Sequence, residues 1–132
     1  RVIPGYQQAL FAPEQLQQLY QQHYRITARF DRMGCQLAGA AITPPPQQLV
    51  SEGICYGAIQ IPPSGQPIIL LADRQTVGGY HKPGSCLRLD LDALAQRPPG
   101  TDLRMRAISA AAAVVASRQA LQQFWQTTAQ PA

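Results

Sequence analysis

Residues 67–80 read PIILLADRQTVGGY, and within these positions an apolar run changes abruptly to a polar one. The first part, Ile68-Ile69-Leu70-Leu71, has no polar face, so a strand at this place would be buried on both sides. The second part begins with Asp73 and Arg74, which put two opposite charges at the end of that strand. The stretch therefore predicts a buried strand whose end carries side chains suited to binding.

Short strand signals lie on both sides of this stretch, separated by frequent Pro and Gly residues. The segments expected to form strands are residues 24–30, 35–41, 57–61, 86–91 and 103–108, with a turn at 31–34. These strands are not separated by regular helices, which disfavours a doubly wound α/β sheet. We therefore expect a mainly β fold, a β-barrel with flanking helices.

The helices are expected near the two ends of the chain. Pro13 suits the first turn of a helix, because its missing N–H costs nothing there. Ser109 can cap a final helix through its hydroxyl group. The inner stripe of that helix is expected to consist of residues at helical spacing, namely Ala110, Ala113, Val114, Ser117, Leu121 and Phe124.

Length and composition exclude several classes of protein. The chain has 132 residues, which suits one domain with a real core, and no apolar run approaches the roughly 20 residues of a membrane span. The net charge is +4, but the basic residues are scattered singly, which disfavours a nucleic-acid surface. Three cysteines without CxxC spacing disfavour a disulfide framework and a zinc site. We therefore expect a cytoplasmic protein that binds no nucleic acid, membrane or metal.

The charged residues allow two interpretations. A planar guanidinium such as that of Arg74 can hold a carboxylate or phosphate with two parallel hydrogen bonds, and Asp73 stands beside it. Alternatively, Asp73 and Arg74 form structural ion pairs with the similar dipeptide Asp31-Arg32 at the rim of the barrel. On the residues alone, the structural alternative is favoured over ligand contact.

Other polar positions are equally ambiguous. Gln60 stands in an otherwise apolar strand and points either into a polar pocket or, as simple alternation favours, outward to water. Gly78-Gly79 allows a ligand to approach the backbone or merely permits a turn. His81 and Lys82 are candidates for a general acid or base or for anion contacts, although such a loop pair is more often solvated. The sequence contains no Gly-x-Ser-x-Gly elbow and no Gly-x-x-x-x-Gly-Lys-Ser/Thr phosphate loop.

Several blocks of this sequence, in order, resemble the KipI-antagonist family, also called allophanate hydrolase subunit 2 or the C subunit of 5-oxoprolinase. The blocks are RVIPG at 1–5, DRMG at 31–34, GAIQIPP at 57–63, GQPI at 65–68, LADRQT at 71–76 and GGY at 78–80. Together they cover nearly the whole chain. The sequence departs from the family pattern at Cys35, where a ring is expected, and after Tyr80, where His81-Lys82 replaces a Pro-Lys step.

The resemblance implies a cyclophilin-like closed β-barrel, with residues 1–132 as a single domain that forms the C-terminal part of a longer subunit. It further implies a KipI-like partner, the B subunit of 5-oxoprolinase, and ATP-dependent opening of 5-oxoproline to glutamate by the assembled complex. Related domains transfer a carboxyl group from carboxybiotin to urea, so biotin enters only under that alternative. A third alternative is a regulator that binds a KipI-like kinase inhibitor without catalysis.

The resemblance also implies a site for a small amide or lactam held between two barrels. Asp73 and Arg74 are the residues expected to be catalytic. Seven further residues are expected to contact the substrate: Asp31, Arg32, Gln60, Gln75, Gly78, Gly79 and Tyr80. Without its partner the chain is expected to be inactive.

Overall fold

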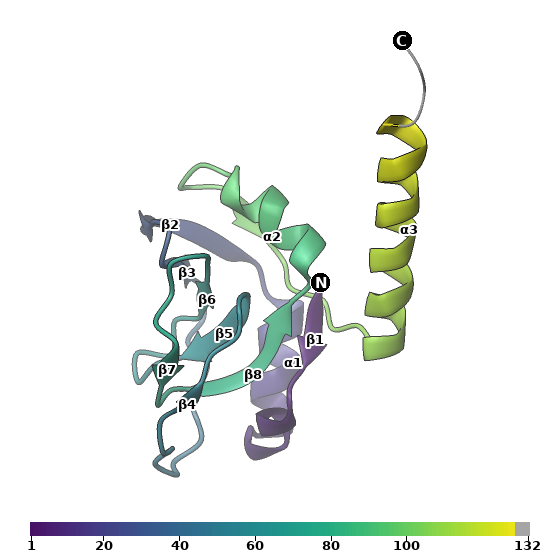
Figure 1. Cartoon of the computed structure of the whole chain (residues 1–132). Coiled ribbons are helices and arrows are strands. Elements are labelled where there is room, and N and C mark those ends of the chain that lie inside the picture. Colours follow the sequence, from purple (N-terminus) through teal and green to yellow (C-terminus); the bar gives the residue numbers. More distant parts are fainter. Residues whose placement is uncertain (129–132) are drawn as a thin grey trace.

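The computed structural model describes residues 1–128 and has a mixed α/β fold (Figure 1). The elements follow in the order β1 (Val2–Pro4), η1 (Tyr6–Leu10), α1 (Pro13–Gln21), β2 (Tyr24–Phe30), β3 (Gly34–Ala38), β4 (Glu52–Gly53), β5 (Ala58–Ile61), β6 (Ile68–Leu70), β7 (Val77–Gly78), β8 (His81–Cys86), α2 (Arg88–Ala95), β9 (Asp102–Leu103) and α3 (Ala110–Thr128). The expectation of a mainly β fold is therefore corrected, because three α-helices hold about as much of the described chain as the strands do.

Seven strands form one antiparallel sheet in the order β1-β8-β5-β6-β3-β2-β9, and β4 pairs separately with β7. The sheet curves into a half-barrel and does not close, because its edge strands β1 and β9 are not paired. A single parallel bridge between Val2 and Ala107 reaches across the gap. The prediction that the barrel closes is therefore wrong. Strand β9 is only two residues long and cannot form a ladder with β1.

The inner face of the half-barrel carries the main core. Alternation along the strands supplies Ile26, Leu37, Ile59 and Ile69, each at most 2% exposed. Leu19 of α1 and Leu91 of α2 belong to the same cluster and cover this face. Helices α1 and α2 thus cover the inner face of the open sheet.

The outer face is buried around β5 and β6. All four residues of β5 are buried, and Ala58 forms a second cluster with Ile54 and Leu70. Ile54 directly follows β4, so the two-stranded β4–β7 sheet covers this part of the outer face. The prediction that the Ile68-Ile69-Leu70-Leu71 run is buried on both sides is confirmed, because Ile69 enters the inner core and Leu70 the outer cluster.

Two predicted strands after residue 80 are corrected. Of residues 86–91, only Cys86 lies in a strand, as the last residue of β8, and α2 begins at Arg88. Of residues 103–108, only Leu103 lies in a strand, β9. Leu87 and Leu91 are both buried at the i, i+4 spacing of one helical face. The sequence HKPGSC has weak strand propensity, and β8 exists because β1 and β5 pair with it on both sides. A Cβ at Gly84 would lie 2.5 Å from the carbonyl oxygen of Ile3, so only glycine allows β1 to come so close.

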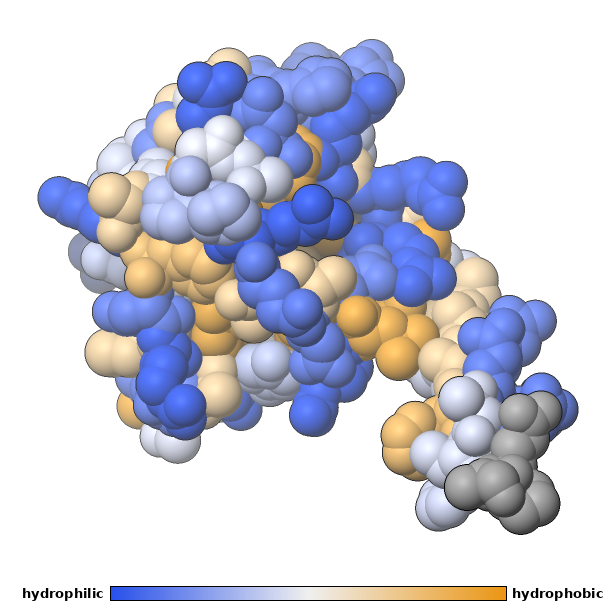
Figure 2. Space-filling model, turned by 90° about the horizontal axis from the view of Figure 1, so that it is seen from above, coloured by the Kyte–Doolittle hydropathy of each residue, from blue (hydrophilic) through white to orange (hydrophobic). Residues whose placement is uncertain are grey.

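The last helix stands away from the body of the molecule (Figures 1 and 2). Its start is as predicted, since Ser109 Oγ accepts a hydrogen bond from the Ala112 N–H at 3.1 Å. The expected inner stripe is wrong, because only Ala113 is buried and Leu121 and Phe124 are more than half exposed. Within residues 1–128, no helix has both the length and the apolar character needed to cross a bilayer.

Candidate functional site

A cleft of about 290 Å³ on the outer face of the sheet brings together residues that lie far apart in the chain. The polar side chains that line this outer cleft are Arg29, Asp31, Gln36, Gln60, Gln75 and Tyr80. Four of them, Asp31, Gln60, Gln75 and Tyr80, are residues expected to bind substrate. Arg32, Asp73, Arg74, Gly78 and Gly79 do not line it.

Gln60 is the least exposed of these polar residues. It points outward by alternation with Ile59 and Ile61, yet it is only 1% exposed because the two-stranded β4–β7 sheet covers it. Its side-chain Nε2 is buried and has no hydrogen-bond partner within the described chain. A buried amide donor without a partner costs roughly 1–3 kcal/mol, so Gln60 carries an unmet hydrogen bond at the wall of the cleft.

Gly78 allows β7 to lie this close to Gln60. A Cβ at position 78 would lie 3.0 Å from Gln60 Nε2 and 2.7 Å from Ile54 Cδ1. The space that glycine leaves is therefore filled by the protein itself, and β7 covers the amide. Gly78 shapes the wall of the site from behind without lining the cleft.

The two Asp-Arg dipeptides meet at the surface. Arg32 Nε donates to Asp73 Oδ2 at 2.5 Å, and the side chains of Arg32 and Asp73 are 80% and 50% exposed. The guanidinium holds the pKa of the Asp73 carboxyl below its usual value. Asp31 uses its Oδ1 to accept hydrogen bonds from the backbone N–H groups of Met33 (2.8 Å) and Gly34 (3.2 Å). These contacts are those of a stabilised turn and a rim ion pair.

Arg74 turns away from this pair and toward the backbone. Its Nε donates to the Ile54 carbonyl at 3.2 Å and its Nη1 to the Leu71 carbonyl at 3.4 Å. The guanidinium also lies 5.7 Å from the centre of the Tyr56 ring. Arg74 thus ties the segment after β4 to the end of β6. The catalytic role expected for Asp73 and Arg74 stays a prediction.

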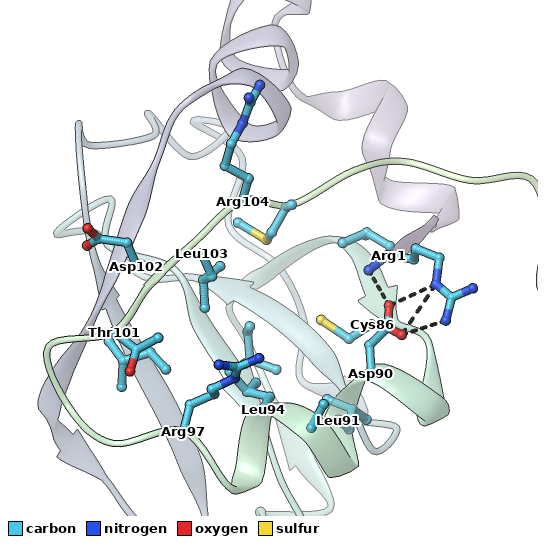
Figure 3. A pocket seen from close by; sticks show the side chains of 15 residues that line it. Arg1, Cys86, Asp90, Leu91, Leu94, Arg97, Thr101, Asp102, Leu103 and Arg104 are labelled. Carbon is cyan, nitrogen blue, oxygen red and sulfur yellow. Dashed lines mark hydrogen bonds and ion pairs between the residues drawn. The ribbon is translucent and has the colours of Figure 1, made fainter.

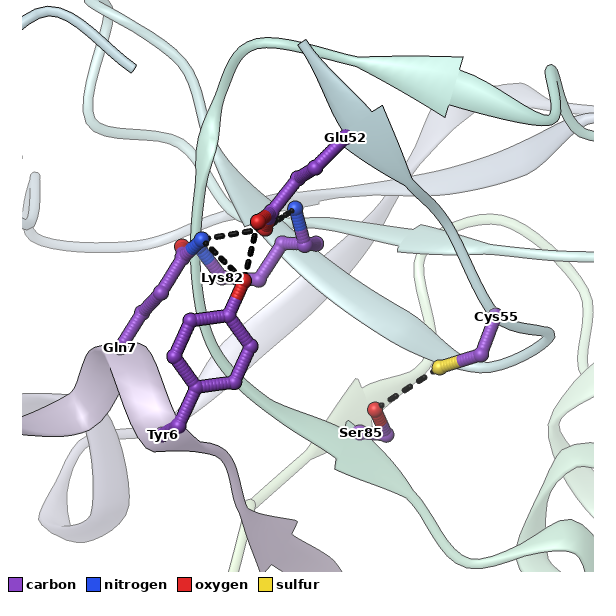
Figure 4. A network of polar contacts seen from close by, with 6 residues as sticks. All are labelled: Tyr6, Gln7, Glu52, Cys55, Lys82 and Ser85. Carbon is purple, nitrogen blue, oxygen red and sulfur yellow. Dashed lines mark hydrogen bonds and ion pairs between the residues drawn. The ribbon is translucent and has the colours of Figure 1, made fainter. Parts of the chain in front are cut away.

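Reasoning from the sequence named Lys82 but missed the other members of a second polar group, and it favoured a solvated loop where His81 and Lys82 are largely buried in β8. Glu52 accepts hydrogen bonds from Lys82 Nζ, Tyr6 and Gln7, and the Lys82 backbone N–H donates to Gln7 Oε1 at 2.7 Å (Figure 4). The side chain of Lys82 is only 12% exposed, and its bond to Glu52 is the main reason why the pKa of that carboxyl is lowered. We call these four residues the Glu52 network.

The Glu52 network borders a cavity of about 390 Å³, which also contains Cys55 with its Sγ 3.2 Å from Ser85 Oγ. Glu52 pairs with Gly78 in the two-stranded β4–β7 sheet, and Gly78 lies next to Gln60 of the outer cleft. One signal was available in the sequence, because Lys82 is the only lysine of the chain. Tyr6 and Glu52 carried no local signal, since they meet across 46 positions.

The described residues offer no obvious cofactor site. Within residues 1–128, no group of three or more His, Cys, Asp or Glu side chains is arranged to hold a metal ion. Lys82 is paired with Glu52, so it is not free to bind a nucleotide phosphate.

Comparison with known proteins gives concordant matches. A family model described as "Carboxyltransferase domain, subdomain A and B" matches residues 1–107. The C subunit of the 5-oxoprolinase of Haemophilus influenzae is 36% identical over 110 residues, which are 83% of this chain and 36% of that protein. The C subunit of the 5-oxoprolinase of Escherichia coli K12 is 30% identical over 130 residues, 98% of this chain and 42% of that protein.

Solved structures share the fold. The urea amidolyase of Kluyveromyces lactis matches with a TM-score of 0.75 at 20% identity, over 86% of this chain and 8% of that protein. This identity supports a common fold alone. The chain spans less than half the length of the curated relatives it matches.

Proposed function

The chain belongs to the carboxyltransferase domain, subdomain A and B, family, and on that premise we propose that it is part of an ATP-dependent 5-oxoprolinase. The complex would open 5-oxoproline to glutamate, with this chain as part of its C subunit and a KipI-like protein as its B subunit. The names of two relatives support this proposal, at 36% and 30% identity. ATP would supply the driving force for ring opening and would bind elsewhere in the complex.

The observation that carries the proposal is the unpartnered Nε2 of Gln60 in a polar cleft. 5-Oxoproline is a small lactam with a ring carbonyl, a ring N–H and a carboxylate. Gln60 would donate its N–H to the lactam carbonyl, and the amide of Gln75 and the hydroxyl of Tyr80 would orient the ring. Arg29 lines the same cleft and would face the carboxylate with its guanidinium.

The KipI-like partner would close the cleft. The outer cleft lies at the surface, and a reaction that polarises an amide gains from the exclusion of water. Asp73 and Arg32 are exposed beside it and would contact the partner. Arg74 would act as a positioning residue, since its bond to the Ile54 carbonyl holds the segment that covers Gln60.

A reconstituted complex tests the proposal. ATP-dependent glutamate release from 5-oxoproline is measured with the KipI-like partner, with and without this chain. We expect turnover only with the chain, and a loss of at least about tenfold with Gln60→Met, because a substrate hydrogen bond is removed. Gln17→Met, on the exposed face of α1, is the matched control and should keep full activity. Equal turnover by Gln60→Met and Gln17→Met would contradict the role of Gln60.

A carboxyltransferase function is the second candidate, favoured by the description of the matching family. In that case the cleft would hold an acceptor amide such as urea, and the carboxyl group would come from carboxybiotin. The same complex would then be inactive with 5-oxoproline and would depend on a biotin carrier. A complex that forms but turns over neither substrate would point to the regulatory alternative.

A further inference from the structure

A separate cavity of about 270 Å³ lies on the inner side of the half-barrel, where the sheet fails to close (Figure 3). Its walls come from elements on both sides of the gap between β1 and β9. The apolar side chains that form the walls include Ile26, Ile69, Leu91, Leu94 and Met105. None of the residues that line this inner cavity lines the outer cleft.

The apolar walls suit the hydrocarbon part of a ligand. Ile26, Ile69 and Leu91 are almost completely buried and hold the far wall in place. Pockets for drug-sized ligands have volumes of roughly 300–1,000 Å³, so a cavity near the lower limit admits a small molecule and not a protein segment. The gap in the sheet gives that molecule a route in from solvent.

The charges at the cavity favour an anion. Two carboxylates line it, but Asp90 is bound by Arg1 Nη2 at 2.7 Å and Asp102 by Arg25 Nε at 2.8 Å. Arg97 also lines the cavity, and within residues 1–128 its guanidinium has no ion pair or side-chain hydrogen bond. Figure 3 shows Arg97 across the front of the cavity between Leu94 and Thr101, whereas Arg104 extends away from it.

We propose that the inner cavity binds a small amphipathic carboxylate, with its aliphatic part against Ile26, Ile69 and Leu94 and its carboxylate on Arg97. A guanidinium presents two parallel N–H donors that match the two carboxylate oxygens. The bond to Arg97 selects the anionic group, and the apolar walls select the chain attached to it. This site lies on the other side of the sheet and does not depend on the function proposed for the outer cleft.

Hexanoate is the test ligand, with acetate as the anion that lacks a tail and hexylammonium as the tail with the opposite charge. Binding is followed by methyl NMR shifts of Leu94 and Met105 in the 132-residue chain. We expect hexanoate to bind at least about tenfold tighter than either control ligand, and at least about tenfold weaker to Arg97→Gln. Arg88→Gln, in the same helical region but stacked on Tyr56, should bind like wild type. Equal binding by the two variants, or by hexylammonium, would overturn the proposal.

Cys86 provides an independent readout, because it lines the inner cavity whereas Cys55 borders the Glu52 network. Hexanoate should slow alkylation of Cys86 by a small neutral reagent several-fold and leave Cys55 unaffected. Leu94→Trp fills the cavity and should abolish this protection. If that variant does not fold, the alkylation rates of Cys86 and Cys55 in the wild-type chain still test the site. Equal rates at Cys86 with and without hexanoate would refute the site.

Discussion

Replacing Gln60 with methionine should make the isolated chain more stable while it damages the proposed site. Gln60 Nε2 is buried without a partner in the described chain, and methionine has nearly the same shape without the polar donor. An unsatisfied buried donor costs roughly 1–3 kcal/mol, part of which water in the cleft can recover. We therefore expect a gain of about 1 kcal/mol in the free energy of unfolding.

The matched substitution Gln66→Met should have the opposite sign. The Gln66 side chain accepts a hydrogen bond from the Gly39 N–H at 3.0 Å and donates one to the Gly39 carbonyl at 3.1 Å. At about 0.5–1.5 kcal/mol for each bond, their loss should cost about 1–2 kcal/mol after allowance for solvent access. The two variants carry the same chemical change and differ only in whether the amide has partners.

Urea unfolding followed by far-UV circular dichroism measures both variants. The single tryptophan, Trp125, is 61% exposed on α3 and would report poorly on the core. For a domain of this size a gain of about 1 kcal/mol raises the melting temperature by roughly 3–6 °C. If Gln60→Met is destabilised as much as Gln66→Met, then the amide of Gln60 has a partner and the reasoning about the outer cleft is wrong.

Three further outcomes are expected. Gly78→Ala should lower turnover of the complex at least about tenfold with little loss of stability, because the added methyl group would displace Gln60 and the flexible end of Ile54. Gly53→Ala is the control, since its methyl group would face open space, and it should change neither turnover nor stability. Arg74→Ala should destabilise the chain by about 1–2 kcal/mol in urea unfolding, because its bonds to two backbone carbonyls are lost. Arg32→Ala removes an exposed, solvent-screened ion pair and should be clearly less destabilising than Arg74→Ala. Burial is the main reason why the pKa of His81 is lowered, so the unfolded chain gains a proton first as the pH falls below about 6.5, and stability should decrease there. His81→Phe should flatten this part of the pH profile of unfolding, and an unchanged slope would show that other groups cause it.

Much of the sheet could be predicted because strand periodicity is a local property. The alternation in β2, the DRMG turn and the apolar run before Ala72 each act over a few residues, and the structure confirms them. Strand β8 could not be predicted, because HKPGSC becomes a strand only between β1 and β5. The stripe of α3 was misjudged for a related reason, since helical spacing of apolar residues does not say whether a surface is there to receive them.

The candidate site likewise has features that the sequence predicts and features that only the folded chain shows. The sequence by itself determined which segments carry polar groups next to buried strands, and so it pointed to Gln60, Gln75 and Tyr80. Only the tertiary structure decided that the β4–β7 sheet covers Gln60, that Arg74 bonds to backbone carbonyls, and that Glu52 reaches Lys82 across 30 positions. Periodicity is a property of neighbouring residues, whereas burial, strand pairing and ion pairing depend on segments that meet only when the chain is folded.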